Sequence, residues 1–262
     1  MLEYAFMQRA FIAGVLIAIL AAVSGTFVVL KRYSLIGETL SHASLVGVAV
    51  AIVAEQRPLY VATIFALVAA WAIEYLRTRF SLYSDSVLSI ILSGSLALAI
   101  IIVSLGGAFN ASLFAYLFGS ILTVSDTDVL TISVVGTITL LALLYFAPRL
   151  YFIAFDEEVA QVSGIKVQAL NFLLISVVAV IISLSIRVVG TLLIGALMII
   201  PVSAALQFRL GFLKTMALAT LFAVLGVILG MALSYHFSIP SGATIVLVTI
   251  AIFIFSLIVK RQ

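Results

Sequence analysis

The sequence predicts an all-helical protein that crosses a membrane many times, and three observations predict this fold class. Hydrophobic residues make up 65% of the 262 residues, charged residues make up only 9%, and the mean hydropathy is +1.40. One soluble core of this size cannot bury so much apolar surface. Long apolar runs also recur, each about long enough to cross roughly 30 Å of hydrocarbon as a helix. These runs do not alternate between polar and apolar residues, which excludes an outer-membrane barrel.

About nine membrane-spanning helices, eight or nine in all, follow one another along the chain. In order, the candidate spans are 10–30, 38–54, 59–73, 87–105, 129–147, 167–186, 188–208, 215–235 and 237–259. A shorter apolar piece, 111–122, is expected to enter the outer leaflet without crossing it. We therefore expect a single transmembrane domain over residues 1–262.

Basic residues are distributed unevenly between the two sides of this predicted bundle. With nine crossings and a cytoplasmic C-terminus, ten Lys and Arg residues fall inside and three fall outside. The inner set is Lys31, Arg32, Arg77, Arg79, Arg149, Lys166, Arg209, Lys214, Lys260 and Arg261, and the outer set is Arg9, Arg57 and Arg187. Because cytoplasmic loops carry an excess of Lys and Arg, the N-terminus is expected outside.

The longest polar segment, residues 149–167, is expected to be a cytoplasmic loop. Within it, the run from Phe155 to Gly164 predicts a short helix, with Asp156 near its N-terminus and Gly164 just past its end. A carboxylate suits the positive end of the helix dipole, and glycine suits the turn that follows a helix. Such a helix either binds a cytoplasmic partner or is a solvated connector, and the residues alone leave both open.

The pair Glu38 and His42 is the strongest pointer to function. The two side chains lie one helical turn apart in an otherwise apolar span, so they point the same way. Ionisable residues within a membrane span are costly and usually line a pathway or a bundle interior. Carboxylate oxygen and imidazole nitrogen together suit zinc, manganese or ferrous iron. The alternatives are that Glu38 caps its helix or pairs with Lys31 or Arg32, and that His42 is a hydrogen-bonded core residue.

Two side chains do not complete a metal coordination shell, so further ligands must come from water, a facing helix or a second protomer. His236, the only other histidine, is a weaker candidate ligand, with a role at the outer membrane interface as the alternative. Asp126 and Asp128 are expected to cap a helix, or else to line a negative vestibule. Arg187 is expected to snorkel at the outer face or to contact a delivery protein.

Several functions are excluded or disfavoured by what the chain lacks. It has no cysteine, which rules out disulfides and thiolate metal sites. It has no phosphate-binding loop of the Gly-x-x-x-x-Gly-Lys-Ser/Thr type, so energy for transport must come from elsewhere. It also lacks His-Glu-x-x-His, the motif of a metalloprotease. The net charge of +3 gives no support to nucleic-acid binding.

Four sequence blocks carry a resemblance to the zinc, manganese and iron permeases of ATP-binding-cassette (ABC) importers. The blocks are 37–49, 115–119, 188–204 and 240–247. The first, Gly-Glu-Thr-Leu-Ser-His-Ala-Ser-Leu-Val-Gly-Val-Ala, is similar to the family signature Gly-Asp-x-Leu-x-His-Ala-x-Leu-x-Gly-Val-Ala. Glu38 stands where the family usually has Asp, which keeps the charge and changes the reach. The family also often has an acid near Ser238, and this chain has none there.

The resemblance implies a type II importer permease, similar in architecture to the cobalamin and siderophore permeases without their first helix. It implies a homodimer in the plasma (inner) membrane, two cytoplasmic ABC ATPase subunits, and an extracytoplasmic protein that delivers the metal. A short helix would couple permease to ATPase, and the residues in that position are Phe155, Asp156, Glu157, Glu158, Val159, Ala160 and Gly164.

On this basis we expect a transport permease and not an enzyme. ATP is bound by the partner subunit, no cofactor is held permanently, and the cargo is a divalent metal, with zinc ahead of manganese or iron. Two alternatives remain open at this point. One is an ATP-independent secondary carrier or channel for cations, and the other is a permease for cobalamin or siderophores.

Overall fold

The computed structural model describes residues 4–80, 82–106, 116–119 and 124–260 of the chain. The helices in these ranges are α1 (Ala5–Leu30), α2 (Ile36–Val53), α3 (Pro58–Phe80), α4 (Ser84–Leu105), α6 (Asp126–Phe155), α7 (Glu157–Val162), α8 (Val167–Val189), α9 (Ile194–Leu206), α10 (Phe212–Phe237) and α11 (Ser241–Lys260). The described ranges contain no strand. The predicted all-helical fold class is therefore confirmed.

Eight of these helices are long and apolar enough to cross a membrane. In hydrocarbon, backbone N–H and C=O groups have no water to bind, so each span satisfies them within its own helix. The ninth predicted span, 188–208, divides: its first two residues end α8, and α9 has only 13 residues. At 1.5 Å per residue, α9 is about 20 Å long, which is shorter than the hydrocarbon layer.

The turn that separates α8 from α9 depends on Gly190, whose φ of +90° favours glycine. A Cβ at Gly190 would also lie 2.5 Å from the backbone nitrogen of Gly119. The backbone N–H of Thr191 donates to the carbonyl of Tyr116 at 2.9 Å, so this turn packs on residues 116–119. The rest of the apolar piece 111–122 lies outside the described residues, and its entry into the outer leaflet stays a prediction.

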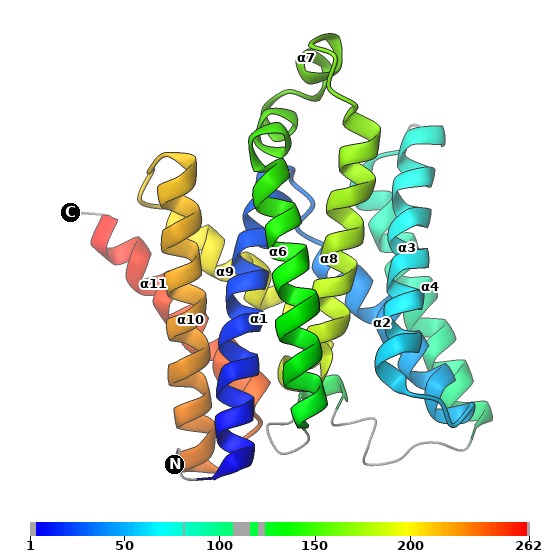
Figure 1. Ribbon diagram of the computed structural model, residues 1–262, viewed down its shortest axis with the longest axis vertical. Helices are drawn as coiled ribbons and strands as arrows, with labels where there is room; N and C mark the ends of the chain where they lie inside the picture. Colours follow the sequence, from blue (N-terminus) through cyan, green and yellow to red (C-terminus); the bar gives the residue numbers. More distant parts are fainter. Residues whose placement is uncertain (1–3, 81, 107–115, 120–123, 261–262) are drawn as a thin grey trace.

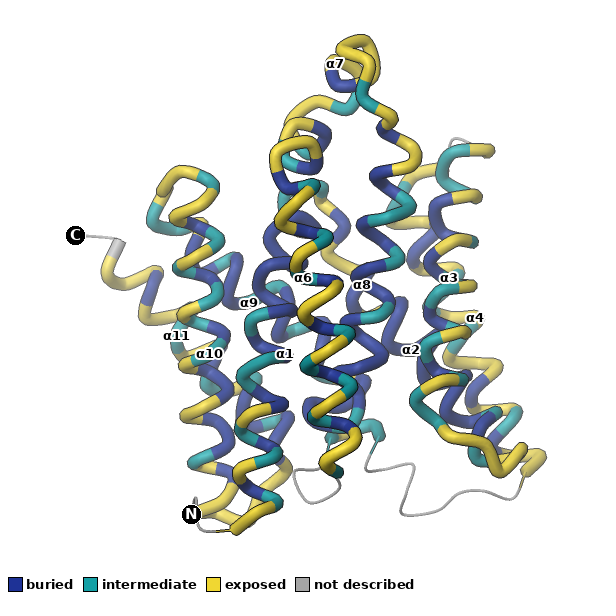
Figure 2. The backbone as a smooth tube through the Cα atoms, viewed as in Figure 1, coloured by how far each residue is buried: buried dark blue, intermediate teal, exposed yellow. Residues whose placement is uncertain are grey.

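The helices form a central row with a group on each side (Figure 1). Helices α1, α6 and α8 contact one another in the middle, α9, α10 and α11 lie on one side, and α2, α3 and α4 lie on the other. Figure 2 shows that α1, α2 and α8 are mostly buried, whereas one face of α6 is exposed along its length. The buried helices form the core of the bundle, and the exposed faces suit contact with lipid.

Glycine lets two of the buried helices approach closely. A Cβ built on Gly25 of α1 would lie 2.1 Å from the carbonyl oxygen of Met198 in α9. Small residues at such crossings allow backbone to pack on backbone in membrane bundles.

The two ends of the bundle are formed by different segments of the chain. The short helix α7 projects beyond the bundle at one end, and the N-terminal end of α1 lies at the opposite end (Figure 1). The C-terminal end of α10, which carries His236, lies at the same end as the start of α1.

Candidate functional site

Helix α2 carries Glu38 in its first turn and His42 one turn further on. The first turn of α2 packs directly on the first turn of α9, because both carry glycine at the contact. A Cβ on Gly37 would lie 3.0 Å from the Cα of Gly195, and a Cβ on Gly195 would lie 3.1 Å from the backbone nitrogen of Glu38. This close approach fixes Glu38 beside the start of α9.

The carboxylate of Glu38 is exposed, although most of α2 is buried. In the described part of the chain, this carboxylate takes part in neither an ion pair nor a hydrogen bond. Lys31, the suggested partner, instead donates a hydrogen bond to the side-chain oxygen of Asn171. The alternative in which Glu38 pairs with Lys31 or Arg32 therefore finds no support.

The imidazole of His42 is only 7% exposed, and its Nδ1 atom has no hydrogen-bond partner. A buried nitrogen without a partner is unusual, because most buried polar atoms are hydrogen-bonded. Glu38 lies close enough to interact electrostatically with the ring. The two predicted ligands thus lie near each other, and each has an atom without a hydrogen-bond partner: an exposed carboxylate in Glu38 and a buried ring nitrogen in His42.

The pair does not form a complete metal centre by itself. Among the described residues, no group of three or more His, Cys, Asp or Glu side chains could hold a metal ion. His236 is exposed in the last turn of α10, with its ring against Tyr235. The structure does not gather it with Glu38 and His42 into such a group, and its role stays a prediction.

Helix α7 has the local structure that the sequence predicts. The side chain of Asp156 caps it by accepting hydrogen bonds from the backbone N–H groups of Glu158 and Val159, each at 3.0 Å. Gly164 follows its end with a φ of +82°. Ala160 is fully buried, whereas the neighbouring apolar side chains are exposed: Phe155 by 71%, Val159 by 49% and Val162 by 90%. The helix thus presents an apolar surface beyond the end of the bundle.

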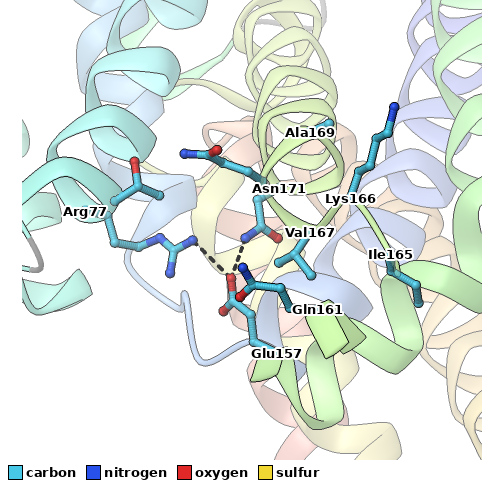
Figure 3. Close-up of a pocket in the computed structure, with 10 residues that line it drawn as sticks. Arg77, Glu157, Gln161, Ile165, Lys166, Val167, Ala169 and Asn171 are labelled. Carbon is cyan, nitrogen blue, oxygen red and sulfur yellow. Dashed lines mark hydrogen bonds and ion pairs between the residues drawn. The ribbon is translucent and has the colours of Figure 1, made fainter. Parts of the chain in front are cut away.

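A network of charged and polar side chains fastens α7 to the membrane helices (Figure 3). Glu157 accepts hydrogen bonds from Asn171 of α8 at 2.7 Å and from Arg77 of α3 at 3.3 Å. Arg77 also donates two hydrogen bonds to Glu74, at 2.7 and 3.1 Å, and the Glu74 side chain is fully buried. Lys31, which follows α1, completes the network through Asn171. Four elements of the bundle therefore meet at one cluster.

Two members of this network, Lys31 and Glu157, are electrostatically coupled. Burial lowers the pKa of Lys31 to about 8, and the negative charge of Glu157 opposes that shift. Burial alone would raise the pKa of Glu157, but the positive charges of Lys31 and Arg77 outweigh it and the pKa is lowered. Both groups are charged at neutral pH, so each stabilises the ionised form of the other.

The opposite end of the bundle contains a second set of ion pairs. Ser125 and Asp128 form a capping box at the start of α6, which confirms the capping prediction for Asp128. Arg187 donates to Asp128 at 2.7 Å, and Arg9 donates to Asp126 at 3.2 Å. Arg187 thus has a carboxylate partner 59 residues away in the sequence, and both its predicted snorkelling at the outer face and its alternative contact with a delivery protein stay predictions.

The network around Glu157 includes three residues whose importance sequence reasoning missed, Glu74, Arg77 and Asn171. The sequence does contain a sign of their importance, because Glu74 and Asn171 interrupt apolar runs. Polar residues in such runs usually bind one another or another polar group. Their partners lie in other helices, and no local pattern identifies them.

The family of the chain follows from comparison with known proteins. The model of the ABC 3 transport family (ABC-3) matches residues 3–260. A Treponema pallidum protein described as a "probable metal transport system membrane protein" is 39% identical over 257 residues, which is 96% of this chain and 94% of that protein. ZnuB, the high-affinity zinc uptake system membrane protein of Haemophilus influenzae, is 32% identical and covers 97% of both chains. ScaB, a manganese import system permease protein of Streptococcus gordonii, is 34% identical and covers 99% of this chain and 93% of its own.

A solved structure agrees with this result. PsaBC from Streptococcus pneumoniae, in complex with Fab, matches with a TM-score of 0.86 and 32% identity, over 97% of this chain and 91% of that one. The family model and the relatives thus cover almost the whole sequence, and the fold agrees over the same length. The chain belongs to the ABC 3 transport family.

Proposed function

We propose that the chain is the membrane-spanning permease subunit of an ATP-driven importer for a divalent transition-metal ion. One observation carries the proposal: an exposed, unpaired carboxylate, Glu38, beside an unpartnered imidazole nitrogen of His42 on a membrane helix. A carboxylate that faced lipid without a partner would be costly, so this position suits a water-filled route for cations.

The ligand pair suits transient binding. Two protein ligands leave most of the coordination shell of a metal to water or to another chain. We propose that a second copy of the permease faces the first and that the route runs between them, with Glu38 and His42 on its wall. Weak binding at this point allows release, which a conducting pathway requires.

Zinc is the proposed cargo, and manganese is the alternative. Imidazole is a ligand that suits zinc, whereas manganese favours carboxylate, carbonyl and water oxygen. The relatives do not decide between the two metals, because ZnuB belongs to a zinc system and ScaB to a manganese system at nearly equal identity. An extracytoplasmic binding protein would deliver the metal and could itself impose the selection.

Helix α7 is the proposed docking element for a cytoplasmic ABC ATPase. The exposed side chains of Phe155, Val159 and Val162 form an apolar surface outside the membrane spans, and such surfaces mark sites of protein contact. The hydrogen bonds of Glu157 to α3 and α8 would pass a displacement of α7 to the bundle. With α7 in the cytoplasm, the N-terminus lies outside, as the distribution of basic residues predicts.

Uptake by reconstituted vesicles tests the metal pathway. Permease and ATPase are inserted into vesicles, and the entry of radioactive zinc is followed with the binding protein on one side and ATP on the other. Glu38→Gln and His42→Ala are expected to reduce uptake at least roughly tenfold, the effect of losing about 1.4 kcal/mol of ion binding. Glu55→Gln is the matched control, because Glu55 is an exposed carboxylate beyond the other end of α2.

The same vesicles separate the competing functions. Uptake that proceeds at full rate without ATP would identify a secondary carrier or channel. Normal uptake by the Glu38→Gln and His42→Ala variants would overturn the assigned route. Parallel measurements with radioactive zinc and manganese decide the cargo, and His236→Ala tests whether that side chain takes part.

A further inference from the structure

A groove opens between α6 and α8, beside the turn that joins α7 to α8. Its volume is about 630 Å³, within the range of about 300–1,000 Å³ that is usual for sites that bind small molecules. Phe146, Leu170 and Leu173 give it an apolar wall, and Arg149 and Lys166 place two cations on it. No carboxylate lines it. A Cβ on Gly164 would meet nothing within 4 Å, so the groove is open at the turn.

The two cations of this groove are unneutralised. Arg149 and Lys166 are exposed, and neither side chain makes a hydrogen bond or ion pair in the described part of the chain. Arg77 and Arg187, by contrast, each bind a carboxylate. Two free cations on one groove, contributed by two different helices, favour an anionic ligand.

The groove is amphipathic along the axis of the bundle. Lys166 immediately precedes α8, and Arg149 lies six residues before the end of α6, about 9 Å at 1.5 Å per residue. Leu170 and Leu173 lie one to two turns further into the membrane span of α8. Charge therefore lies towards the α7 end, where phospholipid headgroups begin, and apolar surface lies deeper, where acyl chains run.

We propose that this groove binds an anionic glycerophospholipid, with its phosphate on Arg149 and Lys166 and an acyl chain along Phe146, Leu170 and Leu173. Basic pockets between transmembrane helices on the cytoplasmic side are suited to such headgroups. The bound lipid joins the end of α6 to the start of α8, the two helices between which α7 is inserted. It thereby steadies the base of α7 without contact with the metal pathway.

Native mass spectrometry of the purified permease tests the site. The protein is released from mixed micelles that contain equal amounts of phosphatidylglycerol and phosphatidylethanolamine, and the lipids that remain bound are counted. The wild type is expected to retain phosphatidylglycerol preferentially. The double variant Arg149→Gln/Lys166→Gln is expected to reduce that preference roughly thirtyfold. Each basic residue near the surface contributes about 1 kcal/mol to the binding of anionic lipid, and the variant loses two of them.

The matched control is Arg79→Gln with Lys214→Gln, which removes two exposed cations that do not line the groove. This variant is expected to retain phosphatidylglycerol as the wild type does. Lys166→Gln alone, at an exposed position, gives an intermediate loss and provides the test should the double variant fail to fold. Equal retention of phosphatidylglycerol by all variants, or equal binding of the zwitterionic lipid, would overturn the proposal.

Two further outcomes identify other occupants. Soluble glycerophosphate that displaces the bound lipid would show that the acyl chain contributes nothing, and would overturn a lipid site. Loss of ATPase assembly by the double variant in every lipid, with phosphatidylglycerol retention unchanged, would assign Arg149 and Lys166 to a protein contact instead. Because the assay measures no metal, its result is independent of the proposed transport function.

Discussion

The Nη2 atom of Arg77 lies 3.3 Å from Oε1 of Glu157, and this ion pair joins membrane helix α3 to helix α7, 80 residues further along the chain. Arg77 is itself held by two hydrogen bonds to the buried carboxylate of Glu74. The position of α7 is therefore fixed by a side chain whose own orientation is fixed inside the membrane helices. Any force applied to α7 reaches α3 and α8 through polar contacts of defined geometry.

Glu157→Gln is expected to uncouple ATP hydrolysis from transport. The variant loses the charge-assisted contact with Arg77, a type of hydrogen bond that contributes about 1.5–3 kcal/mol. Uptake by reconstituted complex is expected to fall roughly tenfold, while ATPase binding and hydrolysis persist. Glu158→Gln is the control, because Glu158 neighbours Glu157 in α7 and makes no ion pair in the described structure. Equal loss in both variants would contradict a specific role for Glu157.

Lys31 is expected to lose its proton near pH 8, well below the 10.5 of a free lysine side chain. Because the unfolded chain keeps this proton to higher pH, the contribution of Lys31 to the free energy of unfolding rises between about pH 8 and 10.5. NMR spectra of ¹³C-methylated lysines give the titration directly, and Lys31→Arg assigns the signal. Removal of the negative charge in Glu157→Gln is expected to lower the pKa of Lys31 further, and an unchanged midpoint would show that the two groups do not interact.

Gly25→Ala is expected to destabilise the bundle. The added Cβ would lie 2.1 Å from the carbonyl oxygen of Met198, so α1 and α9 must move apart, at a cost of about 1–3 kcal/mol. Gly94→Ala in α4 is the control, since a Cβ there meets nothing within 4 Å. At such an open helix position alanine stabilises by about 0.5–1 kcal/mol. Thermal unfolding in detergent should therefore shift in opposite directions for the two variants.

Asp128 and Arg187 are expected to show coupled effects on stability. Removal of either charge leaves the other partly buried without a partner, and each single variant, Asp128→Asn or Arg187→Gln, is expected to cost about 1.5–3 kcal/mol. The double variant should cost less than the sum of the two, because the interaction can be lost only once. Denaturation midpoints of the four proteins give the coupling energy, and strictly additive effects would rule out the ion pair as a stabilising contact.

Most of the fold was predictable from hydropathy, because a membrane imposes the same requirement on every span. Runs of apolar residues long enough to cross hydrocarbon correspond to helices from α1 to α11. The exception is α9, where a glycine turn divides one apolar run. Hydropathy describes only how apolar a residue is. It therefore gives no sign that the φ of Gly190 is positive and that the helix ends there.

The candidate site was predictable only where its members are neighbours in the sequence. Glu38 and His42 share one helix, so helical periodicity predicts that they face the same way. The contacts of Arg77 with Glu157, and of Arg187 with Asp128, join residues 80 and 59 positions apart. Such pairs depend on how the helices pack, and one sequence does not specify that packing locally.

The cluster of Lys31, Glu74, Arg77 and Glu157 combines two basic and two acidic side chains, so its formal charges cancel. The work that a transmembrane potential does on a moving group is proportional to the charge moved, about 2.3 kcal/mol per elementary charge per 100 mV. A rigid displacement of this neutral cluster carries no net charge through the field. Displacement of these four side chains as a unit therefore neither gains nor loses free energy from the voltage across the membrane.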